Sequence, residues 1–85
     1  MSKKVCLIIG GGRGMGAATA RQMHSRDYAL ALMSPTESCE TLATELGGIA
    51  QRGRAESASN LNSVFDLTME KYGRIDSVLI HVGGP

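Results

Sequence analysis

A glycine-rich turn separates a short apolar run from a helix-forming segment near the start of the chain, and this arrangement restricts the fold more than any other feature. The apolar run covers residues 5–9 and is wholly hydrophobic, as is typical of a strand buried on both faces of a parallel sheet. The glycines follow as Gly10-x-x-x-Gly14-x-Gly16, and residues 15–26 favour a helix. A strand, a tight turn and a helix in direct succession indicate the first unit of an α/β fold.

The rest of the chain continues the alternation of apolar runs and helical stripes. The apolar run at residues 29–33 and the apolar centre of residues 75–82 predict two further strands, and residues 49 to about 54 predict a weaker one between them. With right-handed crossovers, the order β-α-β-α-β-α-β predicts a Rossmann-type doubly wound parallel sheet, here a half-sheet with strand order 3-2-1-4. No linker interrupts the pattern, so we expect residues 1–85 to form one domain.

Local signals indicate where the helices begin and end. Ser34-Pro35-Thr36-Glu37 has the pattern of a capping box, in which the Ser34 hydroxyl and the Glu37 side chain bond to each other's backbone amides and Pro35 takes the first helical position. Gly47 and Gly73 suit left-handed helix ends, and a third helix is expected to begin near residues 57–59. The inner stripes predicted for the three helices are Ala17, Ala18, Ala20 and Met23; Cys39, Leu42, Ala43 and Leu46; and Leu61, Val64, Phe65, Thr68 and Tyr72.

Charge and cysteine content exclude several classes of partner. The net charge is +1 with no basic block, which argues against nucleic acid or an anionic membrane surface as partner. The apolar run at residues 5–9 is too short to span a membrane. Cys6 and Cys39 form no disulfide framework and indicate reduced core thiols in a cytoplasmic protein. They are also too scattered from His24 and His81 to predict a metal site.

The glycine turn has a chemical use beyond its shape. A pyrophosphate needs several donors at close range, and backbone amides at a helix amino terminus supply them together with the favourable helix dipole. Side chains at Gly10, Gly14 and Gly16 would block that approach, and Gly16 lets the helix lie close to the strand. Because strand, turn and helix are in register, the pattern favours a dinucleotide site over a merely structural turn.

Two motifs resemble one enzyme family. Residues 8–16 resemble the Thr-Gly-x-x-x-Gly-x-Gly segment of short-chain dehydrogenases/reductases, with Ile9 where the family usually has Thr. Residues 73–83 resemble the segment Gly-Arg-Ile-Asp-x-Leu-Val-Asn-Asn-Ala-Gly that ends the family's fourth strand, with Ile80 and His81 in place of the two Asn. The whole chain is therefore similar to the amino-terminal, nucleotide-binding half of this family.

This resemblance implies an oxidoreductase that transfers a hydride between NADP(H) and a carbonyl or alcohol substrate, with this chain supplying the dinucleotide-binding part. The end of the second strand normally carries an acidic residue in NAD-binding members. Here Ser34 stands there, and Arg13 matches the basic residue of many NADP-preferring members, although a plain helix cap and a solvated turn residue are the alternatives. NADP is thus expected in preference to NAD. The expected cofactor-binding residues are Gly10, Gly12, Arg13, Gly14, Met15, Gly16, Ser34, His81, Val82 and Gly83.

The family's catalytic groups, a Ser and a Tyr-x-x-x-Lys, have no match in this chain. Tyr28 is followed four residues later by Leu32, and Tyr72 by Asp76, so no residue is assigned as catalytic. Asp76 matches the family's Asp before the fourth strand and is interpreted as structural. The chain stops at Pro85, and we expect it to be truncated before the catalytic half.

Two functions remain open from the sequence. The first is a reductase that acts in its full-length form on a small-molecule substrate and assembles as a homo-oligomer, for which the free apolar edge at residues 75–82 is one route. The alternative is a non-catalytic nucleotide-binding or protein-interaction module. His81 is interpreted as a strand-end residue near the cofactor, with a catalytic role as the competing hypothesis, and Arg54 stands about where many family members carry an Asp near the adenine.

Overall fold

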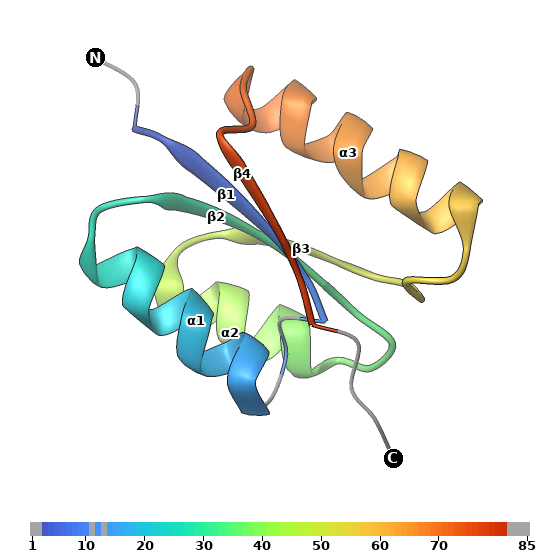
Figure 1. Cartoon of the computed structure of the whole chain (residues 1–85), viewed down its shortest axis with the longest axis horizontal. Helices are drawn as coiled ribbons and strands as arrows, with labels where there is room; N and C mark the ends of the chain where they lie inside the picture. Colours follow the sequence, from blue (N-terminus) through green and yellow to red (C-terminus); the bar gives the residue numbers. More distant parts are fainter. Residues whose placement is uncertain (1–2, 11, 13, 82–85) are drawn as a thin grey trace.

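Strands and helices alternate along the chain in a computed structural model that describes residues 3–10, 12 and 14–81. In order, they are β1 (Val5–Ile9), α1 (Gly14–Ser25), β2 (Ala29–Ser34), α2 (Ser38–Leu46), β3 (Ile49–Arg52), α3 (Ala58–Tyr72) and β4 (Ser77–Ile80). All neighbouring strands pair in parallel, in the order β3-β2-β1-β4. The predicted Rossmann-type half-sheet is therefore confirmed (Figure 1).

The helices cover both faces of the sheet. Figure 1 shows α1 and α2 on one side and α3 on the other. Alternate side chains of β1 point to opposite faces, with Ile8 packing beneath α1 and α2 and Leu7 packing against Val64 of α3. Every residue of β1 is buried, because this strand lies between β2 and β4 and has a helix layer on each side.

The beginning of α2 differs from the capping-box prediction, which is wrong. Ser34 is the last residue of β2: it pairs with Arg52 of β3, and its carbonyl accepts a hydrogen bond from the Gly53 amide at 2.9 Å. The Ser34 carbonyl is thus used in the sheet and not by an amide of a helix that starts at Pro35, while the Ser34 hydroxyl accepts from the Cys39 amide further along. The chain therefore turns through residues 35–37, α2 begins at Ser38, and Pro35 is not its first residue.

The other helix ends agree with the sequence signals. Gly47 and Gly73 both adopt left-handed conformations, with φ of +74° and +75°, and end α2 and α3. Ser57 caps α3, because its hydroxyl accepts a hydrogen bond from the Asn60 amide at 3.1 Å. The Asn60 carboxamide in turn accepts from the Arg54 amide, which takes Arg54 out of the predicted third strand.

Two predicted inner positions are wrong. Ala18 of α1 is exposed, since this helix faces the sheet through Gly16 and Ala20. Phe65 of α3 is 39% exposed, whereas Val64 beside it is fully buried. Together with Met69, Val78 and Ile80, Phe65 belongs to the large apolar side chains that the described residues leave exposed.

Asp76 fixes β4 to β1 at the edge of the sheet away from the glycine turn. Its backbone amide donates to the Val5 carbonyl at 2.9 Å, and its carboxylate accepts from the Val5 amide at 2.7 Å. Arg74 donates to both carboxylate oxygens, and mainly this contact lowers the pKa of Asp76 below its ordinary value. The structural role predicted for Asp76 is confirmed.

Candidate functional site

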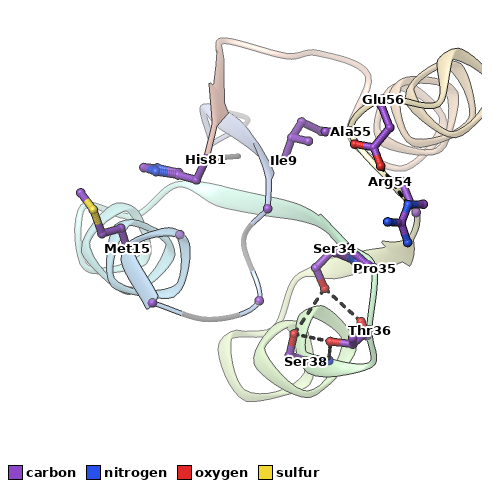
Figure 2. Close-up of a pocket in the computed structure, with 15 residues that line it drawn as sticks. Ile9, Met15, Ser34, Pro35, Thr36, Ser38, Arg54, Ala55, Glu56 and His81 are labelled. Carbon is purple, nitrogen blue, oxygen red and sulfur yellow. Dashed lines mark hydrogen bonds and ion pairs between the residues drawn. The ribbon is translucent and has the colours of Figure 1, made fainter. Parts of the chain in front are cut away.

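A cavity of about 760 Å³ opens at the carboxyl ends of the parallel strands. Parallel α/β sheets bind ligands at this edge, where the strand order reverses, and β1 with neighbours β2 and β4 forms that point here. Segments at or after the ends of all four strands contribute to its wall (Figure 2). The described residues that line it are Ile9, Gly10, Gly12, Gly14, Met15, Gly16, Ser34, Pro35, Thr36, Ser38, Gly53, Arg54, Ala55, Glu56 and His81.

Gly10 is required by the backbone around it. Its φ is +85°, and its amide donates to the Met33 carbonyl at 2.6 Å as the chain leaves β1. A Cβ atom at this position would overlap the carbonyl oxygen of His81. Only glycine therefore allows the turn after β1 to pass so close to the end of β4.

Gly12 and Gly14 serve different purposes. A Cβ at Gly12 would overlap the Ser38 hydroxyl and come within 2.9 Å of the Cys39 amide, so Gly12 packs against the start of α2. Gly14 begins α1 with φ of +59°, and apart from its own helix backbone and chain neighbours no atom of the described residues lies within 4 Å of where its Cβ would stand. Gly14 thus lines the cavity and leaves the space at its Cβ position open among the described residues.

The amino terminus of α1 can hold an anion in that open space. The first amides of an α-helix have no partner within the helix, and the dipole makes this end positive. Gly14, Met15 and Gly16 form the first turn of α1 and all line the cavity. This open space beside the first-turn amides of α1 suits the pyrophosphate of a dinucleotide.

Ser34 organises the opposite wall rather than presenting a free hydroxyl. It is 5% exposed, donates to the Thr36 carbonyl at 2.9 Å and accepts from the Cys39 amide at 3.2 Å. Its oxygen is also 3.3 Å from the Ser38 hydroxyl, which in turn lies 2.9 Å from the hydroxyl of Thr36. When Ser38 donates to Thr36, the exposed Thr36 hydroxyl is free to donate to a ligand.

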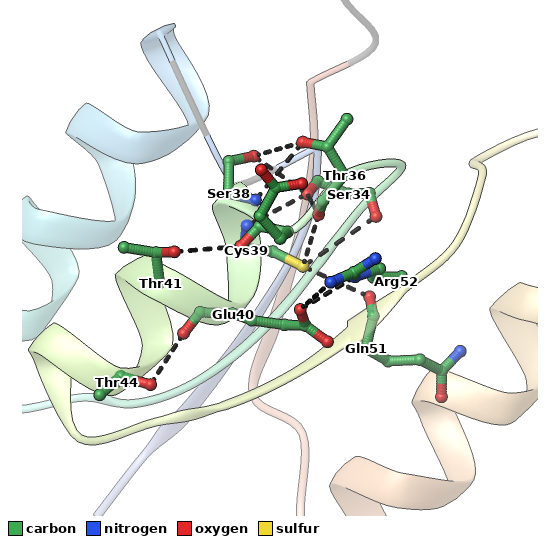
Figure 3. Close-up of polar contacts among 10 residues, drawn as sticks. Ser34, Thr36, Ser38, Cys39, Glu40, Thr41, Thr44, Gln51 and Arg52 are labelled. Atoms are coloured by element: carbon green, nitrogen blue, oxygen red, sulfur yellow. Dashed lines mark hydrogen bonds and ion pairs between the residues drawn. The ribbon is translucent and has the colours of Figure 1, made fainter.

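Contacts behind this wall hold α2 to β3 (Figure 3). The buried Cys39 thiol lies 3.6 Å from the Gln51 carbonyl and 3.5 Å from that of Thr36. At the surface, Arg52 and Glu40 form an ion pair at 2.9 Å, which raises the pKa of Arg52. Of the three hydroxyl residues in this wall, Ser34 ends β2, Thr36 lies in the turn, and Ser38 begins the helix that these contacts hold to the sheet.

An ion pair lines the cavity beyond β3. Arg54 donates through Nε to Glu56 at 2.8 Å, and both side chains are more than two-thirds exposed. The guanidinium lowers the pKa of Glu56 below its ordinary value, chiefly through this hydrogen bond. Arg54 is positively charged and Glu56 negatively charged at neutral pH, so their charges offset each other in the cavity wall.

His81 closes the cavity on the side of β4. Its amide donates to the Ile9 carbonyl at 2.8 Å, which continues the pairing of β4 with β1. Its imidazole Nε2 lies 3.4 Å from the hydroxyl of Thr19 on α1. Figure 2 shows the ring extending toward the first turns of α1, on the same side as Met15.

The structure therefore brings most of the predicted cofactor-binding residues to one cavity: Gly10, Gly12, Gly14, Met15, Gly16, Ser34 and His81. Arg13, Val82 and Gly83 lie outside the described residues. The sequence reasoning did not select Thr36, Ser38, Ala55 or Glu56 as site residues. Their place in the sequence could have indicated them, because each comes shortly after a strand whose carboxyl end lies at this edge of the sheet.

The hydroxyl of Tyr72 does not line the cavity. It donates to the Leu30 carbonyl at 3.0 Å, near the amino end of β2, and burial raises the pKa of this phenol. Tyr72 thus fastens the end of α3 to the sheet.

In the described part of the chain, no helix is long and apolar enough to cross a membrane.

Comparisons with known proteins agree on one family. A family model described as short chain dehydrogenase matches residues 4–85. The rat protein named 3-oxoacyl-[acyl-carrier-protein] reductase is 36% identical over 84 residues, which cover 95% of this chain and 35% of the relative. A Pseudomonas putida protein named 1,6-dihydroxycyclohexa-2,4-diene-1-carboxylate dehydrogenase is 31% identical over 85 residues, covering 95% and 32%.

Solved structures give the same result for the fold. A short chain dehydrogenase from Bacillus anthracis superposes with a TM-score of 0.85 at 25% identity, covering 95% of this chain and 35% of that one. The chain spans about a third of the length of the curated relatives that it matches.

Proposed function

Because the chain belongs to the short chain dehydrogenase family, we propose that residues 1–85 are an NAD(P)-binding Rossmann domain and hold a nicotinamide dinucleotide in the cavity at the strand ends. The observation that carries this proposal is the open space at the Cβ position of Gly14, at the amino terminus of α1. The pyrophosphate would lie there, between the glycine turn and His81. By resemblance, Val82 and Gly83 would flank the cofactor after β4.

The proposed cofactor is NADP(H) in preference to NAD(H). No carboxylate stands at the end of β2 to repel a 2′-phosphate, because that position is Ser34. The Ser34 hydroxyl is used within the turn, so we assign the contact with the phosphate to Thr36 and to Arg13. Arginine suits this role, since its guanidinium binds phosphate oxygens in pairs.

The proposed reaction is hydride transfer between the bound nicotinamide and a carbonyl or alcohol group of a small-molecule substrate. Within this scheme the chain binds and orients the dinucleotide, and the proton-transfer groups typical of the family are not assigned to any of its residues. The two relatives above are named for different substrates, so neither name carries over. We also propose a cytoplasmic homo-oligomer. The family match favours this function over a non-catalytic module.

Titration with NADPH tests the site directly. Gly14→Val should abolish binding, because its side chain would enter the space proposed for the pyrophosphate. Gly47→Val is the matched control: Gly47 also has a positive φ and no atom within 4 Å of its Cβ position, but it ends α2 and does not line the cavity. Both variants should lose comparable stability, of roughly 1 kcal/mol or more, from the left-handed backbone.

Binding and folding are measured separately by calorimetric titration and circular dichroism. The proposal requires that Gly47→Val keeps the affinity of the wild type while Gly14→Val loses it. A folded Gly14→Val protein that binds NADPH as tightly as the wild type would refute the site.

A further inference from the structure

His81 differs from the other ionisable side chains around the cavity. Histidine is the side chain that ordinarily changes charge between about pH 5 and 8. Among the described lining residues, Arg54 and Glu56 are also ionisable, but they pair with each other and keep their charges throughout this range. Any change in the charge of the cavity near neutral pH therefore comes from His81 in this part of the chain.

The contact with Thr19 determines how His81 can be protonated. The Thr19 hydroxyl donates its hydrogen to the Met15 carbonyl at 2.9 Å, so toward His81 it can act only as acceptor. The imidazole Nε2 must then carry a hydrogen. Both the neutral Nε2–H tautomer and the imidazolium satisfy this contact, so the ring can gain a proton at Nδ1 without losing its place.

The ring contacts α1 about one helical turn beyond the proposed pyrophosphate site. Thr19 stands one helical turn beyond Met15, and Met15 belongs to the first turn of α1. One turn advances about 5.4 Å, so a charge on His81 acts on the α1 amino terminus at short range.

Neighbouring elements offer no second group that would mask this charge. On β1, Cys6 is fully buried, and burial raises the pKa of its thiol, so it stays neutral. The strand β4 has no ionisable side chain. On α1, Arg21 is ion-paired with Glu45, and His24 lies in the last turn, away from the cavity. Arg13 lies outside the described residues, and a guanidinium stays charged over this whole pH range.

We propose that His81 couples dinucleotide binding to proton uptake, so that the protonated imidazole strengthens the hold on the pyrophosphate and affinity rises as the pH falls below neutrality. The inference rests on the proposed function, because it takes the pyrophosphate to lie at the α1 amino terminus. The ligand class that His81 recognises is a diphosphate ester with fixed negative charge.

NAD⁺ is the appropriate probe. The 2′-phosphate of NADP is a monoester, and such groups themselves titrate near pH 6, which would obscure His81. The NAD⁺ pyrophosphate keeps its charge between about pH 5.5 and 8.5, so a pH dependence then belongs to the protein. Calorimetric titrations in two buffers of different ionisation enthalpy give both the affinity and the number of protons taken up.

The variants His81→Asn and His24→Asn distinguish the effect of His81 on binding from that of the other histidine. We expect the wild type and His24→Asn to bind NAD⁺ about three- to tenfold more tightly at pH 5.5 than at pH 8.5, with net proton uptake on binding. His81→Asn should bind with nearly constant affinity and without uptake. Imidazole NMR signals provide the second measurement: the titration midpoint of His81 in the wild type should move up on adding NAD⁺, while that of His24 should not.

The outcomes are distinct. NAD⁺ binding without proton uptake in the wild type, uptake that persists in His81→Asn, or an unmoved His81 midpoint would overturn this inference and leave the proposed site intact. Absence of binding at every pH, with either NAD⁺ or NADPH, would overturn the proposed function and this inference with it.

Discussion

Val64→Ala should remove a large part of the stability of this chain. Val64 is fully buried and packs α3 against Leu7 and Ile9 of β1 and Ala31 and Met33 of β2. The substitution deletes two carbons, each worth about 0.8 kcal/mol on burial. The cavity left behind brings the expected loss to about 2–3 kcal/mol.

Val78→Ala is a matched comparison, because it makes the same substitution at a partly exposed valine. Val78 of β4 lies on the same face of the sheet, since it pairs with Leu7, but it is 40% exposed. The same two carbons should therefore cost about 1 kcal/mol or less there. A chain of this length is expected to be stable by about 4–13 kcal/mol in total, so the two variants should differ clearly.

Urea unfolding followed by circular dichroism measures both losses. With a slope near 1 kcal/mol per molar urea, Val64→Ala should lower the midpoint by about 2–3 M and Val78→Ala by about 1 M or less. Equal shifts in the two midpoints would contradict the packing of α3 described above. A changed slope in one variant would show that its unfolded or folded state had also changed, and the midpoints would then be compared as free energies.

Two further predictions concern charge. Arg13→Ala should weaken NADP(H) binding about tenfold or more, because a charged hydrogen bond is worth about 1.5–3 kcal/mol, and should change NAD(H) binding much less. Equal losses in a titration with both cofactors would show that Arg13 does not read the 2′-phosphate. Arg74, and next the Val5 amide, lower the pKa of Asp76, so its stabilising contribution is complete above the ordinary pKa of 3.8 and is lost as the pH falls toward the lower folded-state pKa. Thermal melts of the wild type and Asp76→Asn should therefore converge as the pH is lowered through that window; a constant difference would exclude the linkage.

The sheet was predictable because its signals are contiguous in the sequence. β1 and β2 are short apolar runs, and each of the first three strands is followed by a helix of at least nine residues, so parallel pairing with crossovers was the natural solution. The glycine turn could also be predicted from the sequence. Gly10 and Gly14 have positive φ, and glycine is the residue that adopts such a conformation freely.

The start of α2 was not predictable from local sequence. The Ser34-to-Glu37 pattern is a good helix start by itself, but pairing with Arg52 keeps Ser34 in the sheet. A contact between residues 18 positions apart in the chain thus overrides the local preference. The same long-range pairing turns the Ser34 hydroxyl inward, which is why the donor at the cavity wall is Thr36 and not the serine that the sequence suggested.

For Phe65, periodicity placed the side chain on the inner stripe, yet the structure leaves it partly exposed. Helical spacing reports which residues share a face and not how far the sheet beneath that face extends. Val64 and Leu61 pack against residues of β1 and β2, whereas Phe65 and Met69 are 39% and 48% exposed.

The position of β1 in the middle of the sheet has a consequence for the order in which the protein folds. The first strand of the chain pairs with the last, and the bond from Val5 to Asp76 joins residues 71 positions apart. Closing so long a loop costs entropy that shorter connections do not, so β1, β2 and β3 with α1 and α2 can assemble before β4 arrives. During synthesis on the ribosome, one side of β1 would therefore stay open until residues 77–80 have emerged. We expect that the chain is more exposed to misfolding, and more in need of a chaperone, during this interval than after β4 has paired with β1.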